Sequence, residues 1–408
     1  MKTKNIDYPL FFVVFSLVVF GMIMISSVSV YPSFKVVSLL PKDSMFVKYF
    51  PNAFYFFKSL THTFISILLF ILAAKTPYKF FEKYAKYIFG ATLMFLFIVL
   101  IIGVTYNGAK GWINIPFMPF SLQPAEFLKL GVVIYLAYFL KRKKSDISDF
   151  KNGFMPFIFI IGIIIVLLGL QPDFGTILIV VPISVILFFI GGGNIKHLGV
   201  IFLSGILFAG TIYSMGKVVS GGSRNTFSYI TERFDNFMSD NQTSIQNKTI
   251  NFQTEQGLIA IGSGGYFGLG FGKSIQKFGY LPEVQGDFIF SVIAEELGFF
   301  GVLILVLLYL FIAYRGFFIS SNVTDPFGKY LAAGITTWII VQAFINMGVN
   351  LNIVPLTGIT LPFVSYGGSS LMSLMIGIGI LLNVSRDVNF ETMKHSNSKF
   401  FQRKKVMF

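Results

Sequence analysis

The chain has 408 residues, of which 54% are hydrophobic, only 12% are charged and 51 are phenylalanine. This apolar content exceeds that of a soluble globular protein and indicates a polytopic membrane protein. Zero cysteines exclude disulfides, thiolate catalysis and cysteine-ligated metals, and three scattered histidines argue against a histidine metal cluster. The net charge of +14 collects in short segments between apolar runs, which favours anionic membrane lipids over nucleic acid as partners.

Apolar windows of roughly 17 to 25 residues are long enough to span a bilayer as helices. About ten such windows occur, which predicts an all-α polytopic membrane protein. The predicted spans are residues 9–30, 58–75, 87–105, 125–140, 154–170, 175–191, 197–215, 287–314, 328–349 and 360–384. The first lacks a small-residue cleavage site after a short apolar core, so we expect a retained helix and not a signal peptide.

Basic residues gather on one side of this topology. They are Lys75, Lys79, Lys83 and Lys86, the KRKK run at 141–144, and Arg403, Lys404 and Lys405 in the tail. The positive-inside rule therefore places both termini in the cytoplasm. The outward segments are 31–57, 106–124, 216–286 and 350–359.

The segment 216–286, between spans seven and eight, is too long to be a passive connection. We expect it to be an extracytoplasmic loop with elements of a substrate site. The domain organisation predicted is a single transmembrane domain over residues 1–386, followed by a basic cytoplasmic tail over residues 387–408.

The Gln123-Pro124 pair breaks the chain before the fourth span, where Glu126 and Lys129 lie three residues apart. On a helix this spacing places them on one face, where they can neutralise each other as an ion pair. The spacing fits a structural clamp and leaves open a substrate role in which Lys129 binds a pyrophosphate. Trp112 fits an interfacial anchor.

Asp173 stands in QPDFGT, residues 171–176, in a very short outer connection. Such an acid often caps the next helix, and a ligand or metal contact is the alternative. The glycine-rich stretch 261–274 is weak as a nucleotide motif, since it follows no predicted strand. Its glycines fit a backbone that packs closely against helices, with Lys273 and Lys277 available to an anionic ligand.

Residues 281–301, LPEVQGDFIFSVIAEELGFFG, place three carboxylates in an apolar segment. Ionised groups at membrane depth are costly and usually functional. A helix from Asp287 would place Glu295 about 12 Å away, too far to share a proton, and would turn Glu296 to nearly the opposite side. Asp287 lies where the helix dipole favours the ionised form, which suits a general base and equally an N-cap. We expect Glu295 and Glu296 to satisfy partners between helices.

The last outer loop and the start of the final span contain Ser365, Tyr366 and Ser369. No histidine is nearby in the sequence to activate them as nucleophiles, so packing and hydrogen bonding are favoured. The small residues around them allow tight helix contact.

Several strings together resemble the SEDS family (shape, elongation, division and sporulation), the membrane glycosyltransferases that include FtsW and RodA. The strings are DYPL, GWI with QPAEFLKL, QPDFGT, the glycine-rich stretch, LPE with DFIFSVIAEELG, and PLTGITLPFVSYGGSS. They cover nearly the whole chain in family order, and the glycine-rich and final strings resemble the FtsW branch more than RodA.

The resemblance implies a bacterial multi-pass cytoplasmic-membrane enzyme that polymerises lipid II into glycan strands, with inversion, for cell division or cell shape. Asp287 aligns with the family's essential acid, which implies a general base. Lys129, paired with Glu126, and Lys273 or Lys277 are expected to offset the charge of the leaving pyrophosphate. Ser369 and Gln285 are further candidate substrate contacts.

The resemblance also implies a class B penicillin-binding protein, a transpeptidase, as partner, and lipid II and the nascent glycan as ligands. No cofactor is evident; a divalent cation is a candidate, although no metal-ligand cluster is visible in the sequence. The chain departs from the family in two places. It has Gln285-Gly286 where His-Thr or His-Ser usually precedes the acid, and Gly111 where arginine usually precedes Trp112, with Lys110 adjacent. A lipid II flippase and a non-catalytic scaffold for a transpeptidase are the alternatives.

Overall fold

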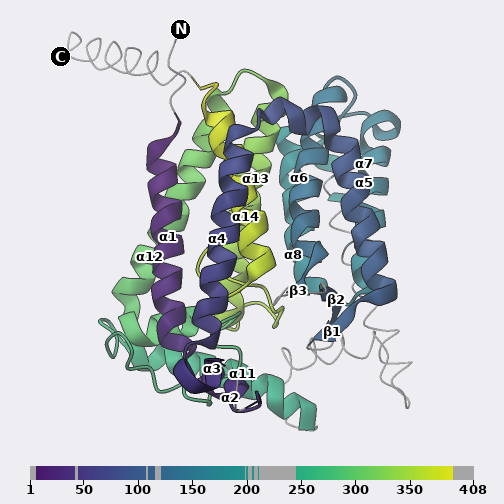
Figure 1. The fold of residues 1–408 in the computed structure, drawn as a ribbon. Coiled ribbons are helices and arrows are strands. Elements are labelled where there is room, and N and C mark those ends of the chain that lie inside the picture. The colour runs from purple at the N-terminus through teal and green to yellow at the C-terminus, as the bar shows by residue number, and fades with distance from the viewer. Residues whose placement is uncertain are drawn as a thin grey trace, which may run out of the picture.

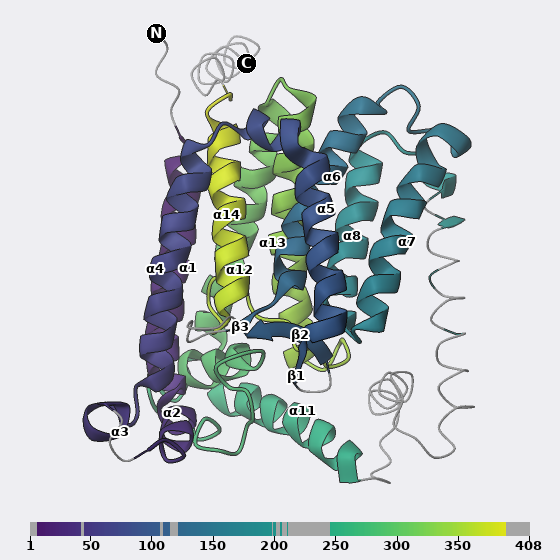
Figure 2. The same cartoon turned by 45° about the vertical axis from the view of Figure 1, so that its right-hand side comes forward.

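The computed structural model describes residues 6–41, 45–106, 109–114, 121–197, 199–200, 205, 210 and 245–388. In these residues the chain is mainly helical, with long helices that run side by side (Figures 1 and 2). The long helices are α1 (Tyr8–Val28), α4 (Phe54–Lys75), α5 (Tyr78–Ile102), α6 (Pro124–Arg142), α7 (Met155–Leu170), α8 (Phe174–Ile190), α12 (Ile289–Asn322), α13 (Pro326–Asn350) and α14 (Gly368–Ser385). A short π-helix, η1 (Phe150–Phe154), leads directly into α7.

The predicted all-α polytopic fold is confirmed. In the described part, seven helices are long and apolar enough to cross a membrane: α1, α4, α5, η1 with α7, α12, α13 and α14. Helix α8 is apolar but shorter, and α6 packs in the same bundle against α5, α8 and α13. Most of the predicted span 197–215 lies outside the described residues, so the number of ten spans stays a prediction; the tail after Val388 also lies outside them.

Both ends of the described chain lie on one side of the bundle. Helix α1 begins there, α14 ends there, and the connection from α4 to α5 with its lysines lies on the same side (Figure 1, top). This arrangement agrees with the cytoplasmic placement of both termini that the basic residues predicted.

The opposite, outer side carries elements that hydropathy did not predict. They are α2 (Val30–Val37), α3 (Met45–Tyr49), α11 (Ile245–Gly264), and the strands β1 (Val104–Tyr106), β2 (Ala109–Asn114) and β3 (Ser121–Leu122). The strands form a small antiparallel sheet in the order β1-β2-β3, in which Trp112 pairs with Val104 and Ile113 with Leu122. Each strand is far shorter than the apolar windows that identify spans, so the region read as an outer loop.

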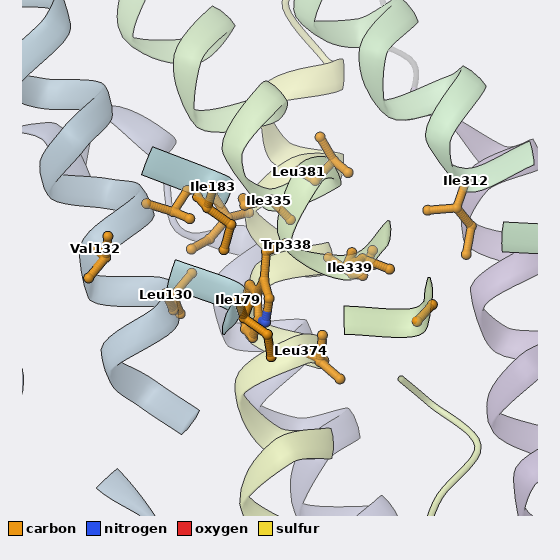
Figure 3. Close-up of a cluster of buried hydrophobic side chains, with 14 of the residues drawn as sticks. Leu130, Val132, Ile179, Ile183, Ile312, Ile335, Trp338, Ile339, Leu374 and Leu381 are labelled. Carbon is orange, nitrogen blue, oxygen red and sulfur yellow. The ribbon is translucent and has the colours of Figure 1, made fainter. Parts of the chain in front are cut away.

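Helices α13 and α14 form the centre of the bundle. Trp338 of α13 is completely buried, among side chains of α6, α8 and α14 that include Leu130, Ile179 and Leu374 (Figure 3). Close packing of this kind fills the bundle on the cytoplasmic side of the site described below.

Helix α12 is kinked at Gly298, whose φ is 66° and ψ −167°. The kink frees the backbone carbonyls of Glu295 and Glu296, which accept hydrogen bonds from the N–H groups of residues 269 and 270 at 2.9 and 3.0 Å. A Cβ atom on Gly298 would lie 2.3 Å from the nitrogen of Gly268, so the crossing requires glycine. The glycine-rich stretch therefore packs closely against a helix, as its composition indicated.

Candidate active site

A cavity of about 310 Å³ lies at the outer end of the bundle. Its wall is built from the outer ends of α4, α6, α8 and α14, from β2 and β3, and from loop residues 283, 286–287 and 357–360. The charged and imidazole side chains that line it are Lys58, His62, Glu126, Lys129, Asp173, Glu283 and Asp287. Segments that are more than 200 residues apart in the sequence thus contribute to one polar site.

Asp287 lines this cavity and is half-buried. Its backbone carbonyl accepts hydrogen bonds from the Nδ2 atoms of Asn346 and Asn350, at 2.9 and 2.8 Å. The N-cap position of α12 is Phe288, and no side chain at that position makes a capping hydrogen bond. The cavity position of Asp287 favours a chemical role over the N-cap alternative.

Three amides of α13, spaced four residues apart, share the face of the helix that is turned to the site: Gln342, Asn346 and Asn350. Asn346 and Asn350 hold the backbone at Asp287, and Asn350 Oδ1 also accepts from the hydroxyl of Ser291 at 2.7 Å. Gln342 lies deeper in the bundle, where its side chain contacts Lys129. This row was not predicted from the sequence, although amides at every fourth position of an apolar span are a readable signal.

Lys129 and Glu126 form the ion pair that their spacing predicted, with Nζ and Oε2 2.8 Å apart. Lys129 is only 1% exposed, and its Nζ also donates to Gln342 Oε1 at 2.9 Å. Trp338 Nε1 donates to the same oxygen at 2.9 Å, while Gln342 Nε2 donates to the Thr360 carbonyl at 3.1 Å. Because the ammonium is paired inside a buried network, the geometry favours the structural clamp for this lysine.

Asp173 caps α8, accepting from the N–H and hydroxyl of Thr176 at 2.9 and 2.8 Å. This is the capping role that the Pro-Asp turn predicted. Burial raises the pKa of Asp173 above its ordinary value, while the hydrogen bonds from Thr176 act in the opposite direction. Ser369 also lines the cavity, and its Oγ accepts from the N–H of Gln123 at 3.0 Å, which ties the start of α14 to the start of α6.

Three other candidate substrate residues do not line the cavity. Gln285 is buried beside it, and its carbonyl accepts from the N–H of Tyr366 at 2.8 Å. Lys273 is exposed on the glycine-rich segment. Lys277 is 4% exposed, and its Nζ lies 2.8 Å from Glu296 Oε1 and 2.8 Å from Ser27 Oγ.

Glu295 and Glu296 bind the same glycine-rich segment. Glu295 accepts from the hydroxyl of Ser274 and from the N–H of Ile275, the latter at 2.9 Å. Glu296 pairs with Lys277 and accepts from the N–H of Gly272 at 3.0 Å. Both acids satisfy partners between elements, as expected.

Lys58 and His62 of α4 line the cavity and were not identified from the sequence. They are four residues apart near the outer end of a span, so they share a helix face. His62 is buried, whereas Lys58 is half-buried.

A family model for FtsW, RodA and SpoVE, described as cell cycle protein, matches residues 8–389. This chain belongs to that family. It is 38% identical over 398 residues to the probable peptidoglycan glycosyltransferase FtsW of Bacillus subtilis strain 168, covering 96% of this chain and 93% of the relative. It is 35% identical over 395 residues to stage V sporulation protein E of the same organism, covering 95% and 99%.

Solved structures share the fold. A chain from work on the structural coordination of polymerization and crosslinking by a peptidoglycan synthase complex matches with a TM-score of 0.73 and 25% identity, covering 95% of this chain and 99% of that one. The rod shape determining protein RodA of Thermus thermophilus matches with a TM-score of 0.66 and 27% identity, covering 94% and 98%. The resemblance read from the motifs is confirmed, and the chain is a multi-pass protein of the bacterial cytoplasmic membrane.

Proposed function

We propose that this protein is a peptidoglycan glycosyltransferase that polymerises lipid II into glycan strands on the outer face of the cytoplasmic membrane. The observation that carries the proposal is the outer cavity with half-buried Asp287 on its wall. Membership of a family with relatives described as probable peptidoglycan glycosyltransferases supports it.

In the proposed reaction the Asp287 carboxylate takes the proton of the acceptor 4-hydroxyl. The acceptor oxygen then forms a bond to the anomeric carbon of the donor strand. The bond from that carbon to the phosphate oxygen breaks, and its electron pair leaves with the polyprenyl pyrophosphate. One displacement inverts the anomeric centre. The two amide donors on the Asp287 carbonyl fix the backbone from which this carboxylate projects.

The depth of the site supports surface chemistry. Transport sites usually lie near the bilayer midplane, between broken helices. Here the lining residues of α4, α6, α8 and α14 belong to the outer ends of those helices. A carboxylate at that level is accessible to sugars on the outer face.

A transpeptidase partner fits the proposal, because the solved chain with the TM-score of 0.73 comes from a peptidoglycan synthase complex that couples polymerization to crosslinking. We propose a class B penicillin-binding protein as that partner, with lipid II, nascent glycan and anionic lipids as ligands.

The decisive experiment supplies labelled lipid II to the full chain purified with its transpeptidase partner and compares wild type with Asp287→Ala. We expect glycan from the wild type and a loss of about 100-fold or more in the variant. Glu255→Gln on α11, an exposed carboxylate outside the cavity, is the matched control. A folded Asp287→Ala protein that polymerises as fast as wild type would contradict the assignment.

Two further arms separate the alternatives. Reconstituted vesicles test whether labelled lipid crosses the bilayer: crossing without glycan synthesis identifies a flippase. If neither the wild type nor Asp287→Ala makes glycan, but the chain stimulates crosslinking by the partner, the chain is a scaffold. A chelator added to the wild type tests the divalent cation, since a required cation makes the rate fall and recover when the metal is restored.

A further inference from the structure

The charge of the cavity raises the question of which group binds an anionic ligand. A pyrophosphate in a partly buried site needs positive groups to replace its hydration. Lys129 is 1% exposed and already neutralised by Glu126. The remaining carboxylates of the lining belong to Asp173, Glu283 and Asp287. Any anion that binds here therefore depends strongly on a further cation.

Lys58 is that cation in the described part of the cavity. It is half-buried, and its ammonium makes no ion pair with a described residue. The ammonium lies 5.2 Å from the ring centroid of Phe54, one turn earlier on α4. A cation–π contact of this kind positions a lysine without cancelling its charge, so the charge remains available to a ligand.

His62 stands one turn further into the bundle on the same face, beside the start of α14. A Cβ atom on Gly368 would lie 2.8 Å from the imidazole, so the ring packs directly on that glycine. The Tyr366 ring lies 5.7 Å away, centroid to centroid. These contacts hold the imidazole against the cavity wall. The imidazole carries a ring N–H that can donate a hydrogen bond, one helical turn from Lys58.

We propose that Lys58 and His62 form the subsite for the pyrophosphate group of the polyprenyl-linked substrate, with Lys58 supplying the charge and His62 a hydrogen bond. The subsite rests on the proposed function and gives that site a substrate-binding wall on α4. Lys129 then keeps the structural role that its contacts show.

The test measures binding separately from turnover. Isothermal titration of the full chain with its partner uses two probes, farnesyl pyrophosphate and inorganic pyrophosphate, against wild type, Lys58→Ala, Lys58→Arg and His62→Ala. Loss of a charge-assisted hydrogen bond predicts about 10- to 100-fold weaker binding by Lys58→Ala, with partial recovery in Lys58→Arg. We expect a smaller loss, about 3- to 10-fold, for His62→Ala. Lys35→Ala, an exposed lysine of α2 on the same side of the membrane, is the matched control and should bind as wild type.

The two probes separate a lipid ligand from a free one. Equal binding of both identifies the phosphates as the recognised group, and binding of the farnesyl compound alone adds a lipid-chain contact. Melting temperatures show whether each variant is folded. If wild type binds neither probe, or if folded Lys58→Ala binds as tightly as wild type, the subsite is wrong. If wild type binds as expected but makes no glycan, the subsite stands and the proposed polymerase function fails.

Discussion

Asp287 and Glu295 lie only eight residues apart in segment 281–301, yet their environments are opposite. Glu295 and Glu296 are 1% and 0% exposed, and each accepts from two or more donors of residues 272–277. Asp287 lies half-buried in a cavity wall, and amides hold its carbonyl. A buried acid with all its hydrogen-bond partners in the protein stabilises the fold, whereas the cavity position of Asp287 supports the proposed role as a general base.

The largest expected effects separate the roles of Asp287 and Glu295. Asp287→Asn should lower the rate of glycan synthesis by about 10²- to 10⁴-fold because a general base is lost. Its melting temperature should stay near that of wild type, while Glu295→Gln should lower the melting temperature. Rates and thermal melts of both variants check this. A stability loss confined to Asp287→Asn would reverse the two roles.

The buried pair of Lys277 and Glu296 gives the next largest effect. Lys277→Met leaves a buried carboxylate without its cation, which should destabilise the protein by about 3–5 kcal/mol. Adding Glu296→Leu should recover most of this loss, because both charges are then absent. Thermal melting of the two single variants and the double variant measures the coupling. A Lys277→Met protein that melts like wild type would show that the pair does not hold the segment.

Gly298→Ala tests the close crossing of the glycine-rich segment over α12. A positive φ and a Cβ only 2.3 Å from the nitrogen of Gly268 should cost about 1–3 kcal/mol. Hydrogen exchange should rise first at residues 265–272, which cross the kink. Gly90→Ala in α5, where an added Cβ meets no atom within 4 Å, is the control. Unchanged exchange in Gly298→Ala would mean that the crossing tolerates a side chain.

The smallest effect tests how Asp287 is positioned. Asn346→Leu removes one of the two donors to its carbonyl and should lower kcat about 2- to 10-fold with little change in KM. Asn350→Leu should behave alike, and the double variant should lose more than either. Steady-state kinetics separate the two parameters. A rise in KM at constant kcat would instead make these amides substrate contacts.

Hydropathy and charge predicted most of the helical topology, because apolar length and basic loops report directly on the bilayer. The Glu126–Lys129 pair and the Asp173 cap were also predictable, since both are local along the chain. Lys58 with His62, and the amides of α13, carried a readable period of four residues that was overlooked.

Other features depend on contacts between distant segments. Gly298 reads as an ordinary residue of an apolar helix, and its positive φ is explained only by the backbone that crosses it. Lys277 reads as a loop lysine open to an anion, yet it is buried against α1 and α12. No local pattern distinguishes these cases, because burial is decided by the partner segment.

The network of Lys129, Gln342 and Trp338 also limits the side from which a ligand can reach the cavity. It closes the cavity toward the cytoplasm, and the apolar core of Figure 3 lies around its innermost member. Among the described residues, a sugar headgroup in the cavity therefore meets a sealed floor. The sugar therefore reaches the cavity from the outer half of the bundle and not through its cytoplasmic half.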